Sequence, residues 1–150
     1  MDISESKPVD FQVDVSVSGA FLLHGNEFLL LKRQPNKPQG TTWGLPAGKL
    51  NGGECPLQGA IREVGEEVGI HLDHSDLQHL TQVYFQTDAC RYVFHIYGAQ
   101  LEDRPLVDLS IDEHSEYRWC TFDEGRALEL IHGGMEVLDI CEPMLFKNLY

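Results

Sequence analysis

The chain has 150 residues, 42% of them hydrophobic, which fits one soluble globular domain over residues 1–150. Its 24 Asp and Glu residues outnumber its 11 Lys and Arg residues and give a net charge of −13. This acidity argues against nucleic acid as a partner, because sequence-independent binding needs a basic surface. No apolar run approaches the ~20 residues that span a membrane, no signal peptide is visible, and the four cysteines form no C-x-x-C pair. We therefore expect a cytoplasmic protein with reduced thiols and no membrane segment.

The N-terminal part of the chain predicts strands. Residues 1–10 are polar, and we expect them to form a flexible tail. Valines alternate with polar residues over 13–17, as in a half-buried strand. The apolar runs 20–23 and 28–31 flank the turn-rich segment 24–27 and predict a hairpin.

A loop and then a helix are predicted next. Residues 34–42 are rich in Pro, Asn, Gly and Gln, which is typical of a loop, and 43–46 predict a short strand. Pro56 suits the first turn of a helix, and Gly69 suits its left-handed C-terminal stop. Between them, apolar residues recur at helical spacing and form one stripe: Leu57, Ala60, Ile61, Val64 and Val68.

The C-terminal half predicts three more strands and two more helices. Strand-like runs occupy 79–85, 92–101 and 117–122, and helical patterns lie around 123–131 and 135–145. Strands joined by hairpins, with a few helices packed on them, indicate an α+β layered architecture.

The helix expected after Pro56 carries a crowded group of carboxylates. On a wheel of ~100° per residue, Glu63, Glu66 and Glu67 lie on one flank of the apolar stripe. Their mutual repulsion destabilises the helix, and Gly59 and Gly65 each cost up to ~1 kcal/mol relative to Ala. Crowded hard oxygen ligands suit Mg²⁺ or Mn²⁺, whose charge would relieve the repulsion. Spacing alone does not separate this metal site from a solvated acidic helix face.

The segment Gly48–Ile70 resembles the Nudix box, G-x5-E-x7-R-E-U-x-E-E-x-G-U, in which U is a bulky aliphatic residue. Every defined position matches: Gly48, Glu54, Arg62, Glu63, Val64, Glu66, Glu67, Gly69 and Ile70. With background frequencies of ~6–7% for each fixed residue, a chance match has a probability near ~10⁻⁸ per start position. The chain is therefore identified as similar to Nudix hydrolases of the MutT-like kind.

The resemblance implies a fold and a chemistry. The fold would be the family's α/β/α sandwich with a mixed sheet, and the reaction would be attack of water on a pyrophosphate phosphorus, aided by Mg²⁺ or Mn²⁺. Glu63, Glu66 and Glu67 match the family's metal-binding and general-base carboxylates. Arg62 resembles the arginine that orients a glutamate, and the backbone carbonyl of Ala47 is expected as a further metal ligand. Glu54 matches a position that supports the loop.

A later acidic segment offers another carboxylate to the metal. Many small Nudix enzymes have a similar E-x5-W segment whose Glu reaches the metal site, and Glu113 fits this spacing before Trp119. Glu116 is the second candidate, and ordinary acidic loop residues are the alternative. Which glutamate acts as the general base stays open, because family members differ.

Residues for the substrate are expected near the hairpin and the start of the box. Lys32 and Arg33 end the second hairpin strand and face phosphates in similar proteins, with Gly48 close to the substrate, although solvated basic residues at a strand end are as common. Four aromatic residues are candidates for stacking on a base or for the core: Trp43, Tyr84, Tyr92 and Phe94.

The substrate class is defined only broadly by the resemblance. Markers for ADP-ribose and coenzyme A are not visible, which leaves nucleoside triphosphates, including oxidised ones, or small diphosphate conjugates. The expected partner is thus a small-molecule nucleotide, bound by a monomer or a homodimer. The alternative is a nucleotide-binding sensor or interaction protein without turnover. Such a protein should have lost box carboxylates, and this sequence retains all of them.

Overall fold

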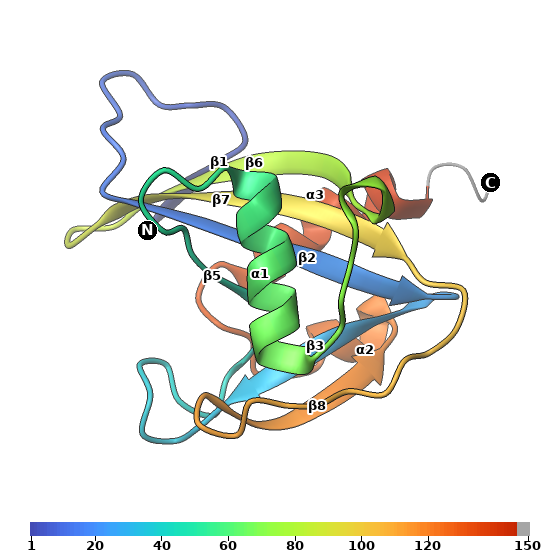
Figure 1. Cartoon of the computed structure of the whole chain (residues 1–150). Coiled ribbons are helices and arrows are strands. Elements are labelled where there is room, and N and C mark those ends of the chain that lie inside the picture. The colour runs from blue at the N-terminus through green and yellow to red at the C-terminus, as the bar shows by residue number, and fades with distance from the viewer. Residues whose placement is uncertain (147–150) are drawn as a thin grey trace.

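Residues 1–146 are described by a computed structural model, drawn in Figure 1. The strands are β1 (Asp2–Ser4), β2 (Val15–His24), β3 (Glu27–Arg33), β4 (Trp43–Gly44), β5 (Ala47–Lys49), β6 (Gln78–Gln86), β7 (Arg91–Gln100) and β8 (His114–Cys120). The helices are α1 (Pro56–Val68), α2 (Phe122–Arg126) and α3 (Gly134–Phe146), with a 3₁₀ turn, η1, at His74–Asp76. Within residues 1–146, none of the helices is both long and apolar enough to cross a bilayer.

The strands form one mixed sheet in the order β1-β6-β7-β2-β3-β4, with β5 paired to β2 and β8 paired to β3. The pairing of β2 with β7 is parallel and runs from Val15 opposite Tyr92 to Leu23 opposite Gln100. The other strand pairs are antiparallel. The predicted hairpin is confirmed by the pairing of Leu23 with Phe28 at the ends of β2 and β3.

Strand β2 changes its neighbour along its length. Its last residues pair with β3, whereas Val17 and Gly19 pair with Lys49 and Ala47 of β5. A side chain at Gly19 would contact the Pro46 carbonyl oxygen and the Ala47 Cβ at 2.5 Å, so the absence of a Cβ allows β5 to approach this closely. The start of the box is thereby fixed beside a central strand.

Two apolar clusters lie on opposite faces of the sheet. Side chains alternate along β2, so Ala20 and Leu22 pack against the apolar stripe of α1, whereas Phe21 and Leu23 pack against residues of α2 and α3. Figure 1 shows α1 crossing one face, with α2 and α3 behind the sheet. The predicted α/β/α sandwich with a mixed sheet is confirmed.

Two segments differ from the sequence-based expectation. Within the expected tail, Asp2–Ser4 form strand β1 and pair with the edge of β6, which has its other side on β7. Helix α2 was expected to extend to residue 131, but it ends at Arg126. Beyond it, the Glu129 carbonyl accepts from the Trp43 N–H and the Ile131 N–H donates to the Trp43 carbonyl, both at 2.9 Å. These bonds to Trp43 hold the segment in an extended path.

Candidate active site

Helix α1 carries the carboxylates and has the ends that the sequence predicts. Pro56 occupies its first turn, and Gly69 closes it in the left-handed conformation with φ 69°. The buried residues Ala60, Val64 and Val68 fix one side of the helix against the sheet. The adjoining flank is thereby held over β5.

Two glutamates of α1 lie against the start of the box. Glu67 is only 3% exposed, and its Oε2 accepts from the Ala47 N–H at 3.1 Å. Burial, followed by the charge of Glu63, raises the pKa of Glu67 well above its usual range. Burial also raises the pKa of Glu63, against the opposing effect of the Arg62 hydrogen bond. The two carboxyl groups therefore lie close together where solvent access is limited, and a cation bound there would stabilise their charged forms.

Gly48 leaves room for the Glu63 carboxyl group. A Cβ at position 48 would overlap all three atoms of that carboxyl group. The Glu63 carboxyl group can therefore lie against the backbone of β5 only while position 48 has no side chain, which gives a physical reason for the Gly at the first box position.

Arg62 holds three of the neighbouring acidic side chains together. Its guanidinium donates to both carboxylate oxygens of Glu54 at 2.8 and 2.9 Å, to Glu63 at 2.9 Å and to Glu66 at 3.1 Å. It also donates to the backbone carbonyl of Lys49 at 2.9 Å. These bonds raise the pKa of Arg62, which stays charged. Arg62 therefore links the helix to the loop and orients Glu63, while Glu66 lies largely in solvent, 60% exposed.

Glu54 supports the loop that precedes α1. It accepts from the Asn51 N–H at 3.0 Å in addition to the bidentate pair with Arg62. The hydrogen bond from Arg62, followed by the one from Asn51, lowers the pKa of Glu54 to about 2. Its carboxylate is thus fully engaged within the loop.

The two later candidates lie in different surroundings. Glu113 is in the turn before β8, and after burial its charge is one of the smaller effects that raise the pKa of Glu63 and of Glu67. Glu116 lies within β8 and pairs with Lys32 of β3, with Nζ 3.4 Å from Oε2. Of the two, Glu113 is the residue that the fold brings toward the box carboxylates.

The two basic residues that were predicted to bind the substrate, Lys32 and Arg33, also lie in different surroundings. Lys32 lies between Glu116 and the ring of Trp43, with its Nζ 6.0 Å from the ring centroid. Arg33 donates from Nε to the Pro38 carbonyl at 2.7 Å and lines the cavity described below. Arg33, rather than Lys32, borders the space available to a ligand.

The carboxylates near the box do not form a preformed set of metal ligands in the described part of the chain. Across residues 1–146, no three His, Cys, Asp or Glu side chains are gathered as such a set. The crowding of Glu63, Glu67 and Glu113, together with the space at Gly48, still fits a hard cation bound by oxygen ligands.

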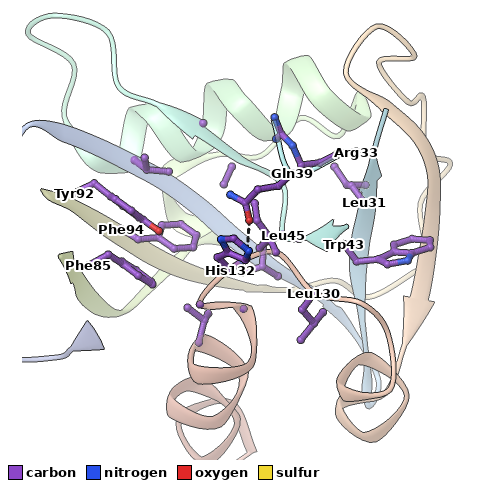
Figure 2. Close-up of a pocket in the computed structure, with 18 of the residues that line it drawn as sticks. Leu31, Arg33, Gln39, Trp43, Leu45, Phe85, Tyr92, Phe94, Leu130 and His132 are labelled. Carbon is purple, nitrogen blue, oxygen red and sulfur yellow. Dashed lines mark hydrogen bonds between the residues drawn. The ribbon is translucent and has the colours of Figure 1, made fainter. Parts of the chain in front are cut away.

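A cavity of about 420 Å³ adjoins this group, and Ala47 and Gly48 form part of its wall. Figure 2 shows Phe85, Tyr92 and Phe94 on one side of it and Trp43 on the other. The rings of Phe85 and Tyr92 are parallel within 5°, with centroids 4.5 Å apart. Tyr84, the fourth aromatic candidate, is not among the residues that line the cavity and packs edge-on against Phe11.

Part of the cavity wall was missed by the sequence analysis. Gln39, from the loop before β4, and the segment 130–134, which ends at the first residue of α3, both line it. The only local signal is the pair Gly133–Gly134. Gly133 has φ 82°, and a Cβ there would overlap the Phe85 ring.

Comparison with known proteins finds relatives of this chain by sequence and by fold. A family model described as the NUDIX domain matches residues 14–138. The chain is 38% identical over 112 residues to a MutT-like protein of Streptomyces ambofaciens, covering 73% of this chain and 65% of that protein. It is 28% identical over 145 residues to Nudix hydrolase 8 of Arabidopsis thaliana, covering 92% and 38%. It is 41% identical over 87 residues to an RNA pyrophosphohydrolase of Psychrobacter arcticus, covering 57% and 50%.

The chain therefore spans less than two thirds of the length of these curated relatives. Among solved structures, the MutT NUDIX hydrolase of Burkholderia pseudomallei is similar with a TM-score of 0.73 and 26% identity, covering 83% of this chain and 95% of that one. The match to the family model, the complete box and the fold lead to one conclusion. The chain belongs to the Nudix family.

Proposed function

We propose that this protein is a metal-dependent pyrophosphohydrolase that cleaves a pyrophosphate bond in a small nucleotide or nucleoside diphosphate conjugate. The observation that carries the proposal is the position of the Glu63 and Glu67 carboxyl groups against Ala47 and Gly48, at the wall of an aromatic cavity. A diphosphate beside Gly48 would thus reach the carboxylates while its nucleoside part entered the cavity.

The residues proposed to hold Mg²⁺ or Mn²⁺ are those that crowd the box. They are the carboxylates of Glu63, Glu66, Glu67 and Glu113 and the backbone carbonyl of Ala47. A bound divalent cation would neutralise the phosphoryl oxygens and activate water for attack. Arg62 orients Glu63 through its hydrogen bond, which keeps that carboxyl group in one place while Glu54 anchors the guanidinium.

A carboxylate near the attacking water accepts its proton, and Glu63 is the proposed base. It is partly buried, and the hydrogen bond from Arg62 holds its carboxyl group in a fixed position from which it can accept a proton from a neighbouring water. The attacking oxygen forms a new bond to phosphorus, and the bond from phosphorus to the bridging oxygen breaks. The bridging oxygen leaves with the second phosphoryl group.

The proposed substrate is a small molecule rather than an RNA chain. The names of the curated relatives include an RNA pyrophosphohydrolase, so pyrophosphate cleavage is the shared chemistry on which the proposal draws. The net charge of −13 repels a polyanion along its whole length, whereas one diphosphate needs positive charge only at its own site. Arg33 at the cavity wall and the bound cation would provide it.

The proposal is tested with a panel of nucleoside triphosphates and diphosphate conjugates, measuring phosphate products with and without Mg²⁺. We expect Mg²⁺-dependent turnover, and Glu63→Gln should lower kcat by at least ~100-fold, as for loss of a positioned base. Glu102→Gln, at an exposed loop position, makes the same change outside the site and should leave kcat unchanged. Tight nucleotide binding without turnover would instead identify a sensor.

A further inference from the structure

The side chain of Gln39 is held with one particular end toward the cavity. The backbone N–H of His132 donates to Oε1 of Gln39 at 2.7 Å, across 93 positions of sequence. A backbone N–H can only donate, so the amide oxygen must face it and the orientation of the amide group is determined. The Nε2 group, with its two donor hydrogens, therefore points away from the His132 N–H. Figure 2 shows the Gln39 side chain reaching among the residues that line the cavity.

The backbone of Gln39 is also constrained. It has φ 53°, in the left-handed region that a residue with a side chain seldom adopts, and Thr41 in the same loop has φ 66°. The Thr42 hydroxyl donates to the Gln39 carbonyl at 2.7 Å and thus secures this conformation. A residue held at both its carbonyl and its side-chain oxygen is preorganised, so little conformational entropy is lost when a ligand accepts from Nε2.

We propose that Gln39 is a specificity-determining residue, whose Nε2 group donates a hydrogen bond to a carbonyl oxygen on the edge of the nucleobase. This inference rests on the proposed function, because it requires the nucleoside part to occupy the aromatic cavity. The cavity is lined mainly by apolar residues such as Leu45 and Phe94, whereas Gln39 is an exposed residue of its wall, so its oriented amide adds a directional donor to a mainly apolar site. A base with an amino group at this position would place its N–H donors against the Nε2 donors of Gln39, and no hydrogen bond could form. Bases with a keto group there should therefore bind more tightly than bases with an amino group.

The test is equilibrium binding of nucleoside monophosphates by calorimetry to the full chain. Two pairs share sugar and phosphate and differ in a keto or an amino group and in the adjacent ring nitrogen, which carries hydrogen only in the keto member: IMP against AMP, and UMP against CMP. The wild type should bind the keto member of each pair more tightly, by up to about tenfold, the effect of one hydrogen bond. Gln39→Glu keeps an oxygen for the His132 N–H and replaces the donor with an acceptor, so the preference should vanish or reverse.

A charge-matched control lies in the same loop. Asn36→Asp makes the same change from amide to carboxylate on an exposed residue, and it should keep the wild-type preference even if all four ligands bind more weakly. A role for Gln39 only in tethering the loops would change all four affinities alike. No keto preference in the wild type, or the same preference in Gln39→Glu, would overturn the inference. Keto-selective binding without hydrolysis of any nucleotide would instead refute only the proposed function.

Discussion

Gly48 and the carboxyl group of Glu63 occupy adjoining space, so position 48 tests whether the geometry of Glu63 matters. A methyl group at Gly48 would overlap the end of a flexible side chain, which can move aside without disturbing the core. Gly48→Ala should therefore fold with nearly the wild-type melting temperature but lose turnover by about 100-fold, as for a catalytic group displaced by ~1 Å. Kinetics and thermal melts measure the two effects. Gly52→Ala is the control, because a Cβ there meets open space and should leave kcat unchanged.

Glu67 tests the metal at the scale of one oxygen ligand. Glu67→Gln keeps an acceptor for the Ala47 N–H but removes the carboxylate that a cation would bind. A ligand that binds only the folded state raises the melting temperature by mass action, so Mg²⁺ should stabilise the wild type and should stabilise Glu67→Gln much less. The measurement is a pair of thermal melts with and without Mg²⁺. An equal shift in the variant would remove Glu67 from the site.

At the scale of elements, Glu113 and Glu116 lie three positions apart on either side of the start of β8. The Glu113 carbonyl accepts from the Gln34 N–H at 2.9 Å and fixes the turn, whereas Glu116 pairs with Lys32 across the strands. Glu113→Gln should therefore raise the Mg²⁺ concentration for half-maximal activity, with some loss of kcat, because it withdraws a hard ligand. Glu116→Gln should have little effect, since exposed ion pairs contribute at most ~1 kcal/mol. Metal titrations at saturating substrate compare them, and the reverse ranking would contradict this assignment.

Elements with local signals were predicted well. Helix α1 begins at Pro56 and ends before Gly69 because both residues act on their own turns of the chain, and the carboxylates share a flank because helical spacing fixes it. Helix α2 was predicted too long because the bonds of residues 129–131 to Trp43 are long-range and leave no trace in local periodicity. The partner change of β2 and the meeting of Gln39 with His132 depend on long-range packing in the same way.

At the scale of the whole molecule, the acidity of the chain bears on the proposed binding of an anionic substrate. The chain carries a net charge of −13, yet the proposed substrate is negative as well. Local groups must therefore outweigh the general repulsion, and the positively charged Arg62 is already engaged by Glu54, Glu63 and Glu66. The cation proposed at the box supplies the missing positive charge where the phosphates would lie. On this proposal, a divalent cation would offset the acidity of the chain at the place where the substrate binds.

Stability against acid is a property of the whole fold to which the sheet contributes through His95. This residue lies in β7, between β6 and β2, and burial, followed by the charge of His79, lowers its pKa. In the unfolded chain a histidine has its ordinary pKa of about 6.5. As the pH falls below that value, the unfolded chain therefore takes up a proton that the folded chain resists, and the free energy of unfolding decreases.

We expect His95→Gln to weaken this dependence, because the variant has no imidazole to protonate at that place in either state. Urea unfolding at pH 8 and at pH 5.5 should show a smaller loss of stability for the variant than for the wild type. His114, whose pKa burial lowers to about 4, is present in both proteins and cancels in the comparison. His71→Gln, at an exposed position, controls for the loss of an imidazole as such. Equal losses of stability in the wild type and His95→Gln would show that His95 is protonated as readily in the folded sheet as in the unfolded chain.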